Sequence, residues 1–178
     1  MPRVCRRRFV TAVAAALPAL ALPRTALGNP DPVRRLHFEH THTGERLAVE
    51  YAHGDQYLPD ALVSVNRLLR DFRTGDVHPI DKELLDLLHG VSGLTETSRP
   101  FQVISGYRSP ATNAMLRQKS VGVAGRSLHM QGMAIDIRLA DVPLAKLRRA
   151  ALAVGRGGVG YYPASNFVHV DTGRVRLW

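Results

Sequence analysis

The chain has 178 residues, 45% of them hydrophobic, and its 24 Lys and Arg outnumber its 15 Asp and Glu to give a formal net charge of +9. This length fits one domain, and the composition excludes a disordered chain and a fibrous repeat. Much of the positive charge precedes residue 29, and no later run of Lys and Arg is dense enough to predict nucleic-acid binding.

Residues 1–28 have the features of an export signal. The run Arg6-Arg7-Arg8 precedes an apolar, Ala-rich stretch from Val10 to Leu22, which is shorter than the roughly 20 residues that a membrane-spanning helix needs. Ala26 and Gly28 suit a cleavage site, and the Arg run fits the twin-arginine type of signal. We therefore predict an exported protein of the periplasm or cell envelope of a bacterium, with the signal cleaved or kept as an anchor. The alternative is a helix packed on the domain.

Cleavage after Gly28 would remove five Arg and the single Cys, Cys5. The remaining domain, residues 29–178, keeps 19 basic and 15 acidic residues and is only mildly basic. It has no thiol, so its rigidity must come from packing or from a bound metal. We expect no membrane span in it after signal cleavage.

The first half of the domain is predicted to contain two strands and then two helices. The strands run from Val33 to His40 and from Glu45 to Tyr51. A helix begins at Pro59, a residue that suits the first helical turn, and continues to about Arg73. Asp81 can cap the second helix, which is expected to give way to a polar connection from Gly90 to Pro100.

The second half is predicted to contain more strands. Ser109 and Pro110 suit the start of a helix, and Gly155 suits the end of another. The expected strands are Phe101–Ser105, Ala134–Arg138, Val159–Tyr162 and Phe167–Asp171, and the expected helices are Pro110–Lys119 and Leu144–Val154. Helices come first and strands cluster late, which favours a single α+β domain whose mainly antiparallel sheet has helices packed on it.

Candidate metal ligands lie near and within two of these strands. Asp136 points away from the apolar face of its strand, and Gly132 lets the chain turn so that His129 can approach it. In the last strand, His169 and Asp171 lie on the face opposite the two Val. Two imidazoles and one carboxylate suit zinc and leave its fourth position for water, as in catalytic sites. The alternative is a hydrogen-bonded structural pair of His and Asp.

Three alternating histidines, His37, His40 and His42, offer a second grouping of metal-binding residue types. A period of two beside a turn is typical of the solvated face of a strand, and we prefer that interpretation to a second metal site.

The pattern Ser-x-His-x-x-Gly-x-Ala-x-Asp at Ser127 to Asp136, followed by His169, resembles the signature of zinc D-Ala-D-Ala peptidases and their murein endopeptidase relatives. The chain looks most like the YcbK-like branch of that group. Further matching motifs are His42–Glu45, Ser105–Ser109, Gly157–Pro163 and Phe167–Gly173. The resemblance implies the hedgehog/DD-peptidase fold and one zinc ion per chain, bound by His129, Asp136 and His169.

The resemblance also implies roles for residues beside the metal. Arg108 matches an Arg that hydrogen-bonds the scissile carbonyl as negative charge builds, although it could instead satisfy carbonyls of its own turn. Ser127 matches a residue that contacts substrate, although it could be an ordinary loop cap, and Tyr107 is a second candidate for substrate binding.

This chain departs from the family pattern at the positions expected to hold the general base. Many relatives carry Glu or Asp three residues before the last ligand, or His two before it, where this chain has Asn166 and Phe167. Asp171 is then the candidate either for the base or for a carboxylate that orients His169. It also suits a plain turn residue.

The function implied by the resemblance is zinc-dependent hydrolysis of peptide bonds in bacterial cell-wall murein. The expected partner is a murein peptide, and the expected enzyme is an endopeptidase that cleaves cross-links, including those between two diaminopimelate residues. The alternatives are a D-Ala-D-Ala-type carboxypeptidase and a non-catalytic, zinc-containing module that binds murein. The sequence leaves the oligomeric state open.

Overall fold

The structure is a computed structural model that describes residues 33–119 and 123–178. The predicted export signal, residues 1–28, lies outside the described residues and stays a prediction. Within the two described ranges, none of the helices has the length and apolar character needed to cross a membrane.

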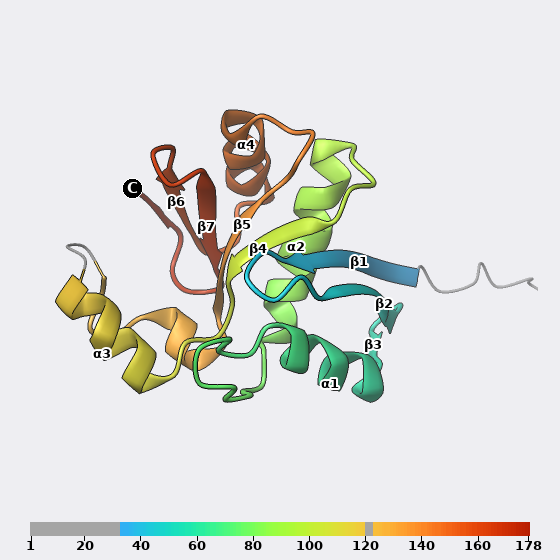
Figure 1. Ribbon diagram of the computed structural model, residues 1–178. Helices are drawn as coiled ribbons and strands as arrows, with labels where there is room; N and C mark the ends of the chain where they lie inside the picture. The colour runs from blue at the N-terminus through green and yellow to red at the C-terminus, as the bar shows by residue number, and fades with distance from the viewer. Residues whose placement is uncertain (1–32, 120–122) are drawn as a thin grey trace, which may run out of the picture.

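One mixed sheet of eight strands organises the described part of the chain, in the order β3-β2-β1-β4-β5-β7-β6-β8 (Figure 1). Its strands are β1 (Val33–His40), β2 (Arg46–His53), β3 (Gln56–Tyr57), β4 (Phe101–Ser105), β5 (Ala134–Arg138), β6 (Gly158–Tyr162), β7 (Phe167–Asp171) and β8 (Arg176–Leu177). The pairs β1–β4 and β6–β8 are parallel, and the other pairs are antiparallel. The predicted α+β domain with a mainly antiparallel sheet is thus confirmed.

Four α-helices and a short 3-10 helix complete the described fold. They are α1 (Pro59–Leu68), α2 (Lys82–Thr95), α3 (Pro110–Lys119), α4 (Leu144–Val154) and the 3-10 helix η1 (Leu128–Gln131). Helices α2 and α4 lie side by side against the sheet (Figure 1). Their Leu84 and Leu147 join Ile135 of β5 and Val168 of β7 in one buried core. The opposite face of β5 and β7 is thereby left to polar side chains.

Two helix ends differ from the prediction. Helix α1 ends at Leu68 instead of continuing to Arg73, because the buried carboxylate of Asp71 accepts the N–H of Arg73 and closes a local turn. Helix α2 continues through the stretch predicted as a polar connection and ends at Thr95. Val91 is fully buried there, so tertiary packing outweighs the helix-breaking tendency of nearby Gly residues.

The predicted helix caps are confirmed at the starts of α2 and α3 and at the end of α4. Asp81 accepts the N–H of Glu83 at the start of α2, and Ser109 accepts the N–H of Thr112 at the start of α3. Gly155 ends α4 in the left-handed conformation, with φ of +68°. Such local signals fix the elements that carry the site.

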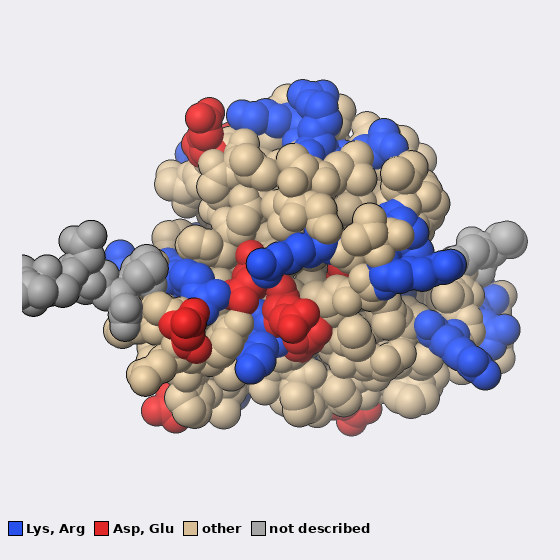
Figure 2. Space-filling view, turned by 180° about the vertical axis from the view of Figure 1, so that it is seen from behind, with Lys and Arg blue, Asp and Glu red and all other residues tan. Residues whose placement is uncertain are grey.

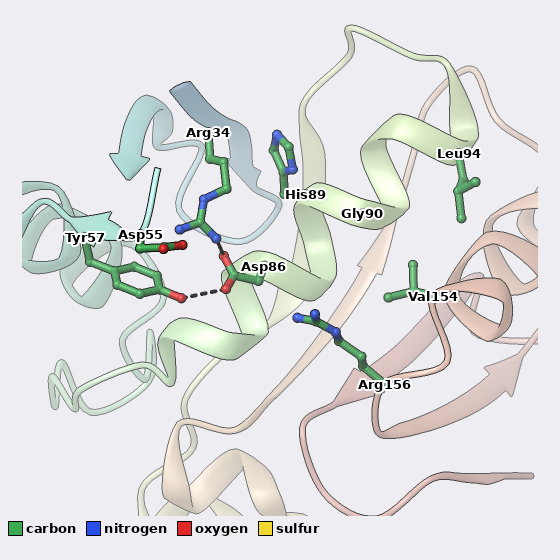
Figure 3. Close-up of a pocket in the computed structure, with 9 residues that line it drawn as sticks. All are labelled: Arg34, Asp55, Tyr57, Asp86, His89, Gly90, Leu94, Val154 and Arg156. Carbon is green, nitrogen blue, oxygen red and sulfur yellow. Dashed lines mark hydrogen bonds and ion pairs between the residues drawn. The ribbon is translucent and has the colours of Figure 1, made fainter. Parts of the chain in front are cut away.

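Acidic and basic side chains also gather near the middle of the face seen from behind (Figure 2). A cleft of about 740 Å³ contains Arg34, Tyr57 and Asp86, which contact one another (Figure 3). Asp86 pairs with Arg34 and accepts the hydroxyl of Tyr57 at 2.6 Å and that of Tyr51 at 2.9 Å. These three donors come from β1, β2 and β3, so the hydrogen-bonded network joins those strands to α2. It also satisfies the carboxylate of Asp86.

Candidate metal centre

The three candidate ligands are brought together by two neighbouring strands and a turn. Asp136 on β5 lies directly opposite His169 on β7 in the antiparallel register. His129 lies in η1, which ends at Gly132 in the left-handed conformation with φ of +68°. A Cβ at Gly132 would lie 2.1 Å from the carbonyl oxygen of Pro79. The turn that returns His129 to β5 therefore requires Gly, as the sequence predicts.

The ligand atoms form a compact triangle. His129 Nε2 lies 3.2 Å from His169 Nδ1, and Asp136 Oδ1 lies 3.3 Å from the first nitrogen and 2.9 Å from the second. Ligands about 2.0–2.1 Å from a tetrahedral zinc ion would be about 3.3 Å apart. The spacing of these three atoms therefore fits one such ion.

The second nitrogen of each imidazole has a partner that sets its tautomer. His129 Nδ1 donates to the carbonyl of Gly106 at 2.7 Å, and His169 Nε2 donates to Asp171 Oδ2 at 2.9 Å. These bonds leave lone pairs on His129 Nε2 and His169 Nδ1, the two nitrogens that face one another. Both lone pairs could bind a metal ion placed between them, and such outer hydrogen bonds are typical of metal-binding histidines.

The titration of the group also suits a metal. Burial lowers the pKa of His129, which keeps its imidazole neutral. Burial alone would raise the pKa of Asp136, but His129, His169 and Arg108 outweigh it, so that this pKa lies well below its usual range. Burial also opposes protonation of His169, but hydrogen bonds to Asp136 and Asp171 outweigh it and raise the pKa of His169. A metal would thus meet an ionised carboxylate and compete with a proton at His169 alone.

Arg108 reaches the same site from the turn after β4. Its Nε donates to Ser105 Oγ at 2.8 Å, and one terminal nitrogen pairs with Asp136 Oδ2, the oxygen that faces away from both imidazoles. Its backbone N–H donates to the carbonyl of His129 at 3.1 Å. Because the side chain binds a hydroxyl and a carboxylate, the interpretation that it satisfies carbonyls of its own turn is not supported.

Asp171 is buried behind His169 and lies outside the lining of the cleft. Besides His169 Nε2, its carboxylate accepts the N–H groups of Gly158 at 3.0 Å and Gly173 at 2.9 Å, and both terminal nitrogens of Arg176. A carboxylate with no exposed surface and this many donors has little means to reach a water molecule in the cleft. The contacts favour the role that orients His169 over the role of general base.

The three candidate metal ligands line a cleft of about 760 Å³, together with Ser127, Tyr162 and Trp178. Ser127 occupies the N-cap position of η1, but its side chain makes no capping hydrogen bond there. Its hydroxyl makes no hydrogen bond to the residues that the structure describes. Tyr107 is not among the lining residues, because its ring stacks on His78 at a centroid distance of 4.7 Å. The structure thus brings Ser127 to the cleft but not Tyr107.

Sequence reasoning missed the residues that hold Arg108 and Asp171 in place. Asp71 accepts both the N–H of Ser109, at 2.9 Å, and its hydroxyl, at 2.7 Å, which anchors the turn that carries Arg108. Arg176 pairs with Asp171 at 2.7 Å. Neither Asp71 nor Arg176 belongs to a motif with a recognisable spacing, so the sequence offers no signal for either role.

His37, His40 and His42 do not form one solvated face. His37 is exposed as predicted, but His40 is buried and the edge of its ring meets Phe72. His42 lines the cleft beside the candidate metal ligands, and its ring stacks on Phe72 at a centroid distance of 4.1 Å. Among the residues that the structure describes, the grouping suited to a metal is that of His129, Asp136 and His169.

Comparisons with known proteins agree with this site. Residues 29–178 match the family described as Peptidoglycan L,D-endopeptidase MepK. The Peptidoglycan L,D-endopeptidase MepK of Escherichia coli strain K12 is 43% identical over 176 residues, covering 97% of this chain and 96% of that relative. The Shigella flexneri protein of the same name matches to the same extent. A Haemophilus influenzae relative is 42% identical over 177 residues, 97% of this chain and 95% of its own length. The chain therefore belongs to the family of Peptidoglycan L,D-endopeptidase MepK, within the zinc D-Ala-D-Ala peptidase group.

Proposed function

We propose that this chain is a zinc-dependent L,D-endopeptidase that hydrolyses peptide cross-links of bacterial murein outside the cytoplasm. The observation that carries the proposal is the buried group of His129, Asp136 and His169 on the wall of a cleft of about 760 Å³. Two imidazoles and one carboxylate leave a tetrahedral ion one further position, as catalysis requires. The Escherichia coli and Shigella flexneri relatives are peptidoglycan L,D-endopeptidases by name.

One zinc ion per chain would be held through His129 Nε2, Asp136 Oδ1 and His169 Nδ1. When bound, zinc would supply Lewis-acid polarisation of a carbonyl and lower the pKa of water toward about 7. The contacts of the imidazoles with Gly106 and Asp171 keep the metal-facing nitrogens unprotonated and fix the orientation of the rings.

Arg108 is the residue that we propose for stabilising negative charge on the scissile carbonyl oxygen. Its bonds to Ser105 and Asp136 fix the guanidinium on the cleft wall, and its Nη1 makes no hydrogen bond within residues 33–119 and 123–178. A preorganised donor of this kind typically lowers the barrier by about 2.7–4 kcal/mol. Ser127, with its uncapped hydroxyl in the same cleft, is proposed to bind the substrate backbone.

The proposed mechanism includes no carboxylate base. Among the described residues that line the cleft, Asp136 is the one carboxylate, and it belongs to the metal group. Asn166 and Phe167 occupy the positions where the resemblance to zinc D-Ala-D-Ala peptidases leads us to expect a base, and Asp171 is buried behind His169. We propose that the metal centre and Arg108 provide most of the rate enhancement, and that Asp171 acts by positioning His169.

The test is cleavage of purified, cross-linked muropeptides of defined linkage by the zinc-loaded protein. We expect L,D-cross-links to be cut, and the activity to be lost with a chelator and in His169→Ala. The exposed residue His37 provides the matched control, because His37→Ala removes an imidazole outside the cleft. Release of terminal D-Ala without cross-link cleavage would replace the proposal with a carboxypeptidase. Binding of muropeptides without any cleavage would replace it with a murein-binding module.

A further inference from the structure

The cleft beside the metal group is strongly cationic. Four Arg side chains line it, at Arg73, Arg108, Arg126 and Arg176, against the single carboxylate of Asp136 among the described lining residues. Arg108 pairs with Asp136 and Arg176 pairs with Asp171. Arg73 and Arg126 have no ion pair within the part of the chain that the structure describes. Two positive charges in the cleft are thus left for an anionic partner.

Arg73 differs from Arg126 because its exposed side chain stacks on a neighbouring aromatic ring. The guanidinium of Arg73 lies over the ring of Phe72, 4.2 Å from its centroid, and the same ring stacks on His42 at 4.1 Å. We call these three residues, His42, Phe72 and Arg73, the Phe72 shelf. Cation–π stacking uses the face of a guanidinium and leaves its N–H groups at the edge free to donate.

The nearest acidic residue does not neutralise this guanidinium. The carboxylate of Asp71 accepts hydrogen bonds from Ser109 and from the backbone N–H of Arg73. It makes no ion pair with the Arg73 side chain. Burial lowers the pKa of Arg73, Asp71 opposes that effect, and the charge of nearby Arg108 adds to it. Arg73 is therefore a cation near Arg108 that stacks on Phe72, and its side chain donates no hydrogen bond to any of the residues that the structure describes.

We infer that the Phe72 shelf is a substrate subsite in which Arg73 binds a free carboxylate of the murein peptide. The inference rests on the proposed function and adds the part of the substrate that the cleft recognises. A planar guanidinium with free edge donors matches a carboxylate in a bidentate manner, which a Lys at the same place would not reproduce. The carboxylate could belong to the side chain of a cross-linking residue or to the end of the peptide.

The test pairs a variant of the protein with a change in the substrate. kcat/KM is measured for zinc-loaded wild type and Arg73→Ala on one cross-linked muropeptide, and on versions in which single carboxylates are converted to amides. Arg67→Ala is the matched control, because Arg67 is an exposed Arg in the last turn of α1 outside the cleft lining. Arg73→Lys tests whether charge alone is sufficient. Zinc content confirms that each variant keeps the metal centre.

For wild type, we expect amidation of one particular carboxylate to lower kcat/KM roughly tenfold to a hundredfold, mainly through KM, as loss of a charge-assisted hydrogen bond predicts. Arg73→Ala should show a similar loss on the unmodified substrate and no further loss on amidation. Arg73→Lys should recover only part of it, and Arg67→Ala should match wild type. The position of the effective amide identifies the side chain or the peptide end as the source.

Two negative results would refute different parts of the proposal. If wild type cleaves the muropeptide but Arg73→Ala discriminates against the amidated substrate as strongly as wild type does, the subsite is refuted and the proposed endopeptidase stands. If zinc-loaded wild type cleaves no cross-link, the proposed function itself fails, and the subsite fails with it.

Discussion

Asp171→Asn is the substitution that most directly tests how His169 is held. In the structure, Asp171 Oδ1 accepts from Gly158, Gly173 and Arg176, whereas Oδ2 accepts from His169 Nε2 and the other terminal nitrogen of Arg176. An Asn amide keeps the most contacts when its oxygen replaces Oδ1. Its NH₂ group then faces His169 Nε2, a nitrogen that can no longer donate.

The consequence is a change of tautomer in His169, the proposed metal ligand. His169 must turn a lone pair toward the Asn amide and carry its proton on Nδ1, the nitrogen that lies 2.9 Å from Asp136 Oδ1. A protonated Nδ1 cannot bind a metal. Loss of such an outer partner typically lowers metal affinity roughly 10–100-fold, which corresponds to about 1.4–2.8 kcal/mol of binding free energy.

The assay is zinc affinity by competition with a chelator, with activity measured at limiting and at saturating zinc. We expect Asp171→Asn to bind zinc more weakly and to regain activity as zinc is added. Asp141→Asn makes the same chemical change at an exposed carboxylate that contacts Thr97, and should leave the affinity unchanged. Wild-type zinc affinity in Asp171→Asn would refute the positioning role. Wild-type affinity together with loss of the rising limb of the pH–rate profile would instead identify a general base.

Three further predictions concern the metal group and the turns around it. His129→Ala and His169→Ala should each lose most of the one zinc ion per chain, as measured by metal analysis of protein purified without chelator. Gly132→Ala should lower the free energy of unfolding by more than about 1 kcal/mol in denaturant titration, because its Cβ would lie 2.1 Å from a carbonyl oxygen, whereas Gly93→Ala, inside α2 with open space around it, should not. The pKa of Asp71 is lowered from 3.8 to about 2, since hydrogen bonds from Thr112, Ser109 and Arg73 outweigh burial. The stability that ionised Asp71 contributes is therefore present above pH 4 and lost as the pH falls toward 2. Over that fall in pH, the difference in unfolding free energy between metal-free wild type and Asp71→Asn should shrink by about 2 kcal/mol.

Elements with a strong local pattern could be predicted from the sequence. Strands β5 and β7 have the predicted bounds because apolar side chains alternate along them, and α4 has the predicted bounds because Gly155 ends it. The positions of His129, Asp136 and His169 follow from the same alternation and from the turn at Gly132. These are short-range features that a single sequence contains.

Contacts between distant segments could not be predicted in this way. The bond from Ser109 to Asp71 joins residues 38 positions apart, and this contact anchors the turn that carries Arg108. The parallel pairing of β1 with β4 likewise depends on where distant strands meet in the sheet. Burial of Val91 against the core, not any local signal, extends α2. Each of these depends on tertiary packing, which overrides local propensity.

The direct pairing of Asp136 with His169 has a consequence for how the protein can tolerate insertions. The ligands meet through the register of β5 and β7, while the chain between them passes through α4 and β6. Extra residues at the exposed positions Ala140 and Asp141 would lengthen a surface connection without shifting that register. The same insertion beside Gly158, whose N–H donates to Asp171, would disturb the support of His169. Sequence length can therefore diverge in the connection before α4 but is constrained at the start of β6.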